Sequence, residues 1–237
     1  MFRPLALLVA LLTLTFVLSP LASPPFTGFR PDQLPVPQVD PPVQPAGYAF
    51  AIWGVIYLWL VASAGFGLFR RAQAQDWDHV RWPLIVSLAA GTPWLFVATR
   101  SALGAFVLIF VMLIPAIVAL LRAPSRDRIW LRTPLALYAG WLTAASCVSL
   151  ATVAAGYGLW FGDGVWAVIA LALAFAIARW VQPKRPETPE YSATVIWALV
   201  AVVIANGSSQ PGIAALAAAG AVGLGLLYWT DRHPRGV

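Results

Sequence analysis

The chain has 237 residues, of which 60% are hydrophobic and 10% charged, with a net charge of +6 and a mean hydropathy of +0.79. Soluble globular domains carry about 25% charged residues, so this composition excludes an ordinary soluble domain and predicts a protein embedded in a bilayer. The positive residues are dispersed over short segments beside apolar runs, which predicts anchors to anionic lipid headgroups and argues against nucleic acid as a partner.

Eight apolar runs follow one another along the chain, and each predicts a helix that crosses the bilayer. Only a helix satisfies its own backbone hydrogen bonds in hydrocarbon, and about 20 apolar residues are needed to cross it. The runs extend approximately over Pro4 to Leu18, Gly47 to Phe69, Trp82 to Thr99, Ala102 to Leu121, Pro134 to Gly156, Val165 to Val181, Tyr191 to Asn206 and Gly212 to Thr230. The predicted fold class is all-α, a polytopic transmembrane bundle of about eight helices.

The first run allows two interpretations. Residues Met1 to Ser23 have one arginine, an apolar core and small residues near the end, which is also the pattern of a secretory signal peptide. We favour a retained helix, because the apolar run reaches the upper end of the usual length for a signal peptide. Cleavage would leave seven helices and would not move any later loop to the other side.

The segment from Ser19 to Ala46 contains nine prolines and is expected to be non-helical. Closely spaced prolines favour extended polyproline II structure and remove backbone donors. The segment therefore suits a semi-rigid strap on the outer side of the bundle, and a solvated linker explains the same composition equally well.

Basic residues assign a side to each loop. Of the 15 lysines and arginines, all but Arg30 and Arg100 fall in alternate gaps between the apolar runs. Such residues are retained in short cytoplasmic loops, so the alternation predicts that both termini are cytoplasmic and that the protein is a multi-pass protein of the cell membrane. The residues predicted to lie inside are Arg3, Arg70, Arg71, Arg81, Arg122, Arg126, Arg128, Arg132, Arg179, Lys184, Arg185, Arg232 and Arg235.

No Asp, Glu, Lys or His falls in the middle of any predicted span. His79, His233 and Lys184 fall in inside segments, and Asp163 falls in an outside turn. Ion-coupled carriers and proton pumps place such groups near the midplane, and a retinal protein needs a membrane lysine, so these classes are excluded. Metal-ligand spacing, a nucleophile elbow, a dinucleotide fingerprint and a P-loop are also absent, so we expect neither an enzyme nor a required cofactor.

Tryptophan is the most informative residue type inside the spans. Seven of the 12 tryptophans fall near span ends, and the deeper ones are Trp53, Trp59, Trp94, Trp141 and Trp197. A buried indole N–H needs an acceptor. Trp53 and Tyr57 are four residues apart, and Tyr138 and Trp141 are three apart, so each pair shares a helix face. These rings either wall a pocket for a flat ligand or pack the core.

Three other patterns leave their roles open. Pro93 and Pro115 each remove a helical hydrogen bond, and Pro93 is expected to kink the third helix. The uncharged polar run 206–210 fits a tight turn or a site equally well. Small residues recur every fourth position and predict close helix packing or a dimer face at Ala136, Gly140, Ala144, Ala170, Ala174, Ala178, Ala217, Ala221 and Gly225.

Three stretches resemble one known family in order along the chain. They are Pro45 to Leu58, with the sequence PAGYAFAIWGVIYL, then Thr92 to Phe96 and Pro134 to Trp141. The first resembles the second-helix signature of the tryptophan-rich sensory proteins, the TspO/MBR or translocator family. The resemblance covers roughly residues 5–156 and five helices, so we expect residues 1–156 to form the family-like region and residues 157–237 to add three helices.

The resemblance implies a function and a set of site residues. The family binds porphyrins, sterols and other flat apolar ligands in a pocket among its helices, and it often forms dimers. By resemblance, the chain is expected to be a membrane receptor or carrier for a flat hydrophobic ligand, with a tetrapyrrole as a candidate and a homodimer as a candidate assembly. The implied ligand-binding residues are Tyr48, Phe50, Trp53, Tyr57, Trp94, Tyr138 and Trp141.

Two other functions fit the same sequence. One is an uncoupled transporter of small organic solutes, in which the three added helices complete a translocation path. The other is an accessory membrane protein that packs against another membrane subunit and binds no ligand.

Overall fold

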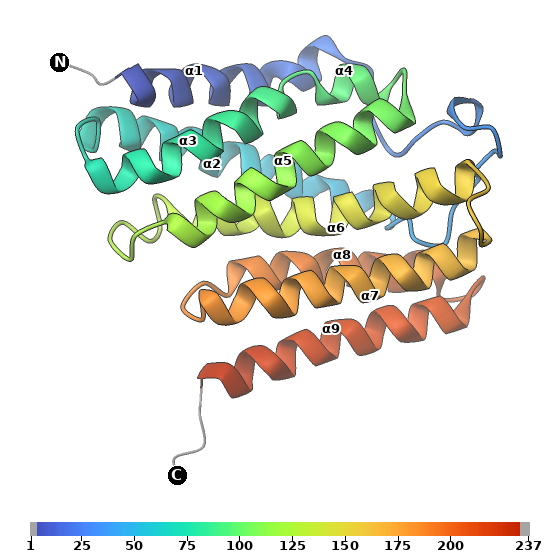
Figure 1. The fold of residues 1–237 in the computed structure, drawn as a ribbon. Helices are drawn as coiled ribbons and strands as arrows, with labels where there is room; N and C mark the ends of the chain where they lie inside the picture. Colours follow the sequence, from blue (N-terminus) through green and yellow to red (C-terminus); the bar gives the residue numbers. More distant parts are fainter. Residues whose placement is uncertain (1–3, 233–237) are drawn as a thin grey trace. The chain divides into compact units, whose positions relative to one another are not determined.

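The computed structural model describes residues 4–232, and it is all-helical, with no strand among these residues (Figure 1). This confirms the predicted fold class. Arg3, His233 and Arg235, which the sequence places on the inner side, lie outside the described residues.

The helices follow the predicted runs closely. The α-helices are α1 (Pro4–Leu18), α2 (Ile52–Arg70), α3 (Gln75–Gly91), α4 (Trp94–Ala98), α5 (Ala102–Arg122), α6 (Arg132–Gly156), α7 (Asp163–Val181), α8 (Glu190–Asn206) and α9 (Pro211–Arg232). The 3₁₀ helices are η1 (Ser19–Ala22), η2 (Pro31–Gln33), η3 (Gly47–Ala51) and η4 (Gln182–Lys184).

Seven helical stretches of the described chain are long and apolar enough to cross a bilayer. Helix α8 is an eighth apolar helix of 17 residues, at the lower limit of about 17–25 residues for a span. The chain is therefore a multi-span membrane protein whose outer surfaces contact lipid.

Two boundaries differ from the prediction. Helix α3 begins at Gln75 instead of Trp82, because Asp76 and Asp78 occupy its first turn, where acidic side chains favour a helix N-terminus. The segment Ser19 to Ala46 is not free of helix, since it contains η1 and η2. Each of these 3₁₀ helices has proline in its first turn, where the missing N–H costs no hydrogen bond.

Proline interrupts one span and not another. Helix α3 ends at Gly91, and α4 begins at Trp94 directly after Pro93, so the predicted break in the third span is present. Pro115 lies inside α5 without ending it.

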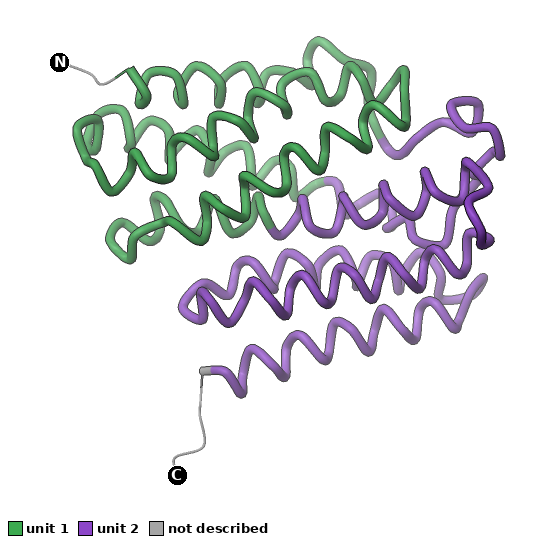
Figure 2. The backbone as a smooth tube through the Cα atoms, in the orientation of Figure 1, with its two compact units in different colours: residues 1–26, 51–139 green, residues 27–50, 140–237 purple. Residues whose placement is uncertain are grey.

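The described chain forms two compact units (Figure 2). Unit 1 comprises Met1–Phe26 and Ala51–Ala139, and unit 2 comprises Thr27–Phe50 and Gly140–Val237. Helix α6 begins in unit 1 and ends in unit 2 (Figure 2). The division of the chain at residue 156 stays a prediction.

In unit 1, α1 packs on α2 and α3, α3 packs on α5, and α4 packs on α5. In unit 2, α7, α8 and α9 pack on one another. Helix α6 approaches α8 closely at Gly140, where an added Cβ would lie 2.6 Å from the carbonyl oxygen of Tyr191. The Thr143 and Tyr191 hydroxyls lie 2.8 Å apart at the same crossing. The small-residue pattern of α6 therefore serves helix packing inside unit 2.

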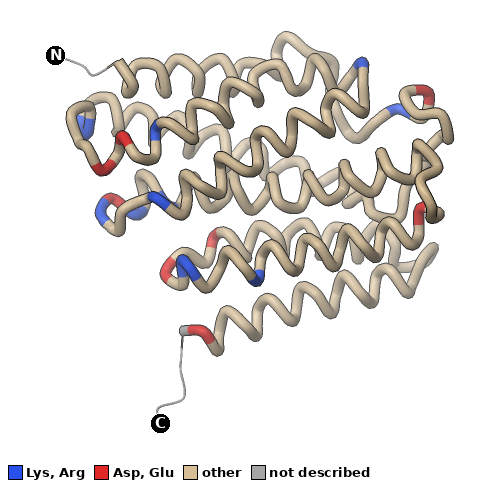
Figure 3. The backbone as a smooth tube through the Cα atoms, viewed as in Figure 1, with Lys and Arg blue, Asp and Glu red and all other residues tan. Residues whose placement is uncertain are grey.

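Charged residues lie at the ends of the helices in each unit (Figure 3). In unit 1 most of the described arginines flank the α2–α3 and α5–α6 connections, and Arg100 lies at the opposite ends of the helices, between α4 and α5. In unit 2 Arg179, Lys184 and Arg185 lie near the α7–α8 connection. We call the end of unit 1 with the arginine-rich connections its basic end.

Candidate functional site

Four aromatic rings from three helices meet in unit 1. The ring of Phe16 on α1 lies edge-on to Trp53, Tyr57 and Tyr138, with centroid distances of 5.8, 5.4 and 5.7 Å. Trp53 and Tyr57 stack on each other at 5.1 Å with an interplanar angle of 26°. We refer to Phe16, Trp53, Tyr57 and Tyr138 as the aromatic cluster. It unites three of the seven residues predicted from the sequence.

Helix geometry and hydrogen bonds explain the position of these rings. Trp53 and Tyr57 lie one helical turn apart on α2 and so share a face. Tyr138 is fully buried, and its hydroxyl lies 3.0 Å from that of Ser87 on α3, which donates to the Met112 carbonyl on α5 at 2.7 Å. A buried hydroxyl without a partner is costly, so this chain of bonds stabilises the ring in the unit.

Phe16 is the member of the cluster that the sequence analysis missed. Its ring lies against Gly91 of α3, where an added Cβ would come within 2.7 Å of the Phe16 ring. The structure buries Ala6, Val9, Thr13 and Phe16 on one face of α1, but the sequence gives no signal for this face, because the helix is apolar all round. The spacing of three and four residues between them is that of one helix face packed on the protein.

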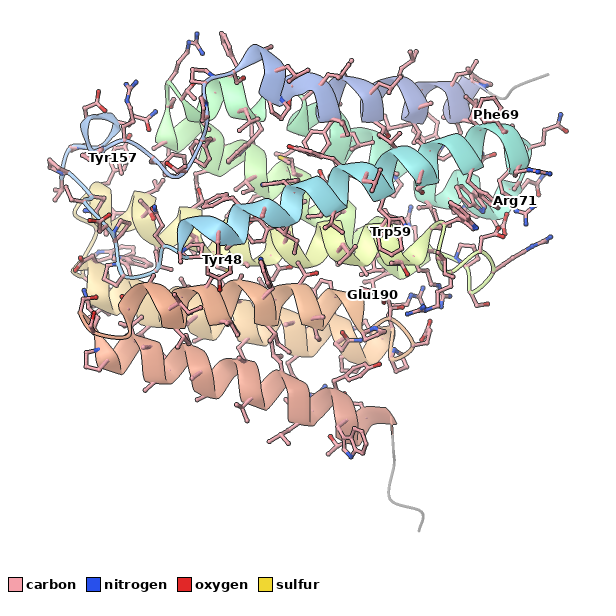
Figure 4. All side chains as sticks on the ribbon, turned by 180° about the vertical axis from the view of Figure 1, so that it is seen from behind. Tyr48, Trp59, Phe69, Arg71, Tyr157 and Glu190 are labelled. Carbon is pink, nitrogen blue, oxygen red and sulfur yellow. The ribbon has the colours of Figure 1, made fainter. Side chains whose placement is uncertain are left out.

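Trp94 lies elsewhere in unit 1, at the start of α4. Its indole N–H donates to the carbonyl of Ala105 at 3.0 Å, and its ring lies edge-on to Phe26 at 5.1 Å. The indole of Trp59 donates to the Ile129 carbonyl at 2.9 Å; Figure 4 shows Trp59 on α2. These deep tryptophans thus have the acceptors that the sequence analysis required.

The other three predicted residues belong to unit 2. Phe50 lies edge-on to Trp141 at 5.8 Å, and Tyr48, labelled in Figure 4, lies edge-on to Trp197 at 5.3 Å. The indole N–H of Trp197 donates to the Ala49 carbonyl at 3.0 Å. Trp197 therefore contacts predicted site residues, although the resemblance did not include it.

The proline-rich segment is bound to helices of unit 2. The amide of Val36 donates to the Gly156 carbonyl of α6 at 2.8 Å, and the side-chain amide of Asn206 on α8 donates to the Pro42 carbonyl at 2.8 Å. Of the two interpretations of this segment, these bonds favour a strap over a solvated linker. We use the name strap for residues 27–46.

A small polar cluster closes the basic end of unit 1. The guanidinium of Arg71, labelled in Figure 4, donates to both carboxylate oxygens of Asp127 at 2.7 and 2.9 Å. The indole N–H of Trp77 donates to Asp127 at 3.3 Å. The hydrogen bonds from Arg71 are the main reason why the pKa of Asp127 lies below its usual range. Asp127 thus joins the α5–α6 connection to α2 and α3.

A cavity of about 20 Å³ lies among α1, α2 and α3, and its lining includes Thr13, Ser63, Trp77 and Arg81. This volume suits about one water molecule and is far below the 300–1,000 Å³ of typical ligand pockets. Among residues 4–232, no three His, Cys, Asp or Glu side chains come together to hold a metal ion. This cavity is therefore too small to hold a flat ligand.

Residues 5–229 match a family described as TSPO-like protein. No curated protein and no solved structure matched the chain. The matched range extends beyond residue 156 and includes α7, α8 and most of α9.

Proposed function

The chain belongs to the TSPO-like protein family, and from this premise we propose that it is a membrane receptor or carrier for a flat hydrophobic ligand. The observation that carries the proposal is the aromatic cluster of unit 1, in which Trp53 and Tyr57 offer a stacked pair beside Phe16 and Tyr138. The first ligand to test is a porphyrin, with a sterol as a second flat apolar molecule. Binding and a conformational response need no covalent chemistry.

The energetics require several rings. A well-placed aromatic contact contributes about 0.5–1.5 kcal/mol beyond the burial of area. Micromolar affinity requires about 8 kcal/mol, so ring contacts supply a part and burial of the apolar ligand supplies the rest, at about 25 cal/mol per Å². The proposal therefore predicts that removal of one ring weakens binding measurably without abolishing insertion into the membrane.

Tryptophan fluorescence tests the proposal directly. The purified protein in detergent is titrated with protoporphyrin and haem, and the titration is repeated with Trp53→Leu. We expect saturable quenching in the wild type and measurably weaker binding in the variant, seen as half-saturation at a higher ligand concentration. Trp82→Leu is the matched control, because Trp82 lies on α3 with 60% of its surface exposed. Equal quenching in all three proteins would indicate nonspecific partitioning and would contradict the proposal.

The predicted residues of unit 2 need their own variant. Trp141→Leu removes the ring that contacts Phe50. We propose that Tyr48, Phe50 and Trp141 also contribute to ligand binding, as does Trp94 in unit 1. Unchanged affinity in Trp141→Leu, with weaker binding in Trp53→Leu, would restrict the proposed site to unit 1.

A further inference from the structure

The strap has few backbone N–H donors, and this limits the hydrogen bonds that can attach it to the helices. Prolines have no N–H, so a segment this rich in proline cannot form a regular ladder of its own. Its carbonyl groups nevertheless need donors wherever they are buried. The strap supplies some of these donors itself, since the backbone and side-chain amides of Gln44 donate to the carbonyls of Pro41 and Thr27. Helix α8 supplies a further donor through Asn206.

Three hydrogen bonds connect α8 to the strap and to η3, which follows it. Asn206 donates to the Pro42 carbonyl at 2.8 Å, the amide of Ala46 donates to the Ala201 carbonyl at 3.1 Å, and Trp197 donates to the Ala49 carbonyl at 3.0 Å. These bonds are spread along α8 from Trp197 to Asn206. The end of the strap and η3 together therefore run beside about two turns of this helix.

Asn206 is well suited to this role. It is buried, with 4% of its surface exposed, and its side-chain amide also donates to the Val202 carbonyl in its own helix at 2.9 Å. Both donors of the amide group are thus used, one inside α8 and one on the strap. The polar run 206–210 is in this way partly explained: its first residue binds the strap.

Apolar contacts support the same attachment. Leu34 and Val43 of the strap are buried. Leu34 lies against Gly156 at the end of α6, where an added Cβ would come within 2.5 Å of the leucine side chain. The ring of Tyr48 lies edge-on to that of Trp197. The strap is thus packed as well as hydrogen-bonded.

We propose that α8 anchors the strap, and that Asn206 and Trp197 are positioning residues that hold Tyr48 and Phe50 in place. In this proposal the role of α8 is to set how often the strap detaches. Where the strap detaches, Tyr48 and Phe50 leave their partners Trp197 and Trp141. This second part rests on the proposed function, because it makes α8 a control on the rates at which the flat ligand binds and leaves.

A spin label on the strap tests the anchor without any ligand. Val39 is 71% exposed and Cys147 is buried, so Val39→Cys in a Cys147→Ala background gives one label site on the strap. We expect Asn206→Leu, and to a smaller extent Trp197→Phe, to increase the mobility of the nitroxide in the spectrum. Trp197→Phe keeps an aromatic ring near Tyr48 and removes the indole N–H together with part of the ring area.

The matched control is Ser208→Ala, which changes an exposed polar residue in the same connection and should leave the label unchanged. Circular dichroism of each variant verifies that the helices remain folded. Unchanged label mobility in both Asn206→Leu and Trp197→Phe would overturn the anchor. If Asn206→Leu does not fold, the label mobility in Trp197→Phe alone tests the anchor.

Stopped-flow fluorescence with protoporphyrin tests the control of rates. Loss of one hydrogen bond that holds the strap should raise both the association and the dissociation rate constants by up to about tenfold. By contrast, loss of a ligand contact in Trp53→Leu should raise mainly the dissociation rate constant. A mobile strap with unchanged rate constants would overturn the control of rates. A mobile strap in a protein that binds no porphyrin would support the anchor and contradict the proposed function alone.

Discussion

Asp127 shows how a single side chain can join two connections of unit 1. Its backbone is in the left-handed region, with φ of 59°, where aspartate and asparagine are tolerated better than most residues. Its carboxylate accepts hydrogen bonds from Arg71 and Trp77, and only 10% of its side chain is exposed. The carboxylate is therefore important for the stability of the basic end and is not tied to the proposed ligand site.

We predict that Asp127→Asn lowers the midpoint of thermal unfolding in detergent by a few degrees. The folded-state pKa of Asp127 is lowered, so its stabilising contribution is present above the ordinary pKa of about 3.9 and is lost as the pH falls through the lower folded value. The difference between wild type and variant should therefore be constant from about pH 5 to 8 and should shrink only below about pH 4.

Asp40→Asn is the control for this prediction. Asp40 also has positive φ, of 47°, and it is exposed on the strap. The same chemical change should therefore have little effect on unfolding there. An Asp127→Asn protein as stable as wild type at neutral pH would show that the ion pair contributes nothing to stability.

Phe16 and Gly91 are in close contact, so substitutions at these two positions should have non-additive effects on the free energy of unfolding. An alanine at position 91 would place its Cβ 2.7 Å from the Phe16 ring, and overpacking of this kind costs about 1–3 kcal/mol. Phe16→Ala should itself lower the free energy of unfolding by about 3–5 kcal/mol, through loss of burial and the cavity left behind. In the double variant the added methyl group has room, so the combined loss should be smaller than the sum.

Thermal unfolding followed by circular dichroism measures this double-mutant cycle. Gly65→Ala on α2 is the control, because nothing lies within 4 Å of its added Cβ. The helix propensity of alanine should make this change neutral or stabilising. Strictly additive effects of Gly91→Ala and Phe16→Ala would contradict the close contact of the Phe16 ring with α3.

Sequence spacing predicted part of the candidate site at this scale. Trp53 and Tyr57 are neighbours on one helix, so their stacking follows from helix geometry alone. Phe16 could not be placed in the same way, because its partners come from other helices and α1 is apolar on every face. Contacts between residues far apart in the chain depend on tertiary packing, which local patterns do not encode.

At the scale of elements, hydropathy predicted the helices well because the bilayer imposes their length and composition. The predicted and observed ends of the fifth and eighth spans differ by at most two residues, and those of the second span agree as closely when η3 is counted together with α2. The main error was at α3, whose first turn contains charged residues outside the apolar run. Apolar composition marks the membrane part of a helix, whereas capping and dipole effects decide where it begins.

The strap is the element whose structure the sequence left open. Proline content excluded a long helix there but could not choose between a strap and a linker. The choice depends on hydrogen bonds to distant helices, such as the bond that Asn206 of α8 donates to the strap from more than 150 residues away in the chain. The sequence shows that residue 206 has a polar side chain, but it does not show that this side chain pairs with Pro42.

At the scale of the whole molecule, the seven residues implied by the resemblance are shared between the two units. Three of them join Phe16 in the aromatic cluster, Trp94 lies elsewhere in unit 1, and three belong to unit 2. The matched family range includes both units, so neither unit alone represents the family. Variants in each unit are therefore needed to locate ligand binding.

The orientation in the membrane is the remaining property of the whole molecule, and it can be tested with two cysteines. The basic residues predict that the α6–α7 connection is outside and the α5–α6 connection inside. Gly162 and Ser125 are exposed in these two connections, and the native Cys147 is buried and should react slowly. In intact cells, an impermeant thiol reagent should label Gly162→Cys and leave Ser125→Cys unlabelled. Permeabilised cells, in which both variants should react, are the control, and the reverse labelling in intact cells would mean that the basic residues do not set the topology.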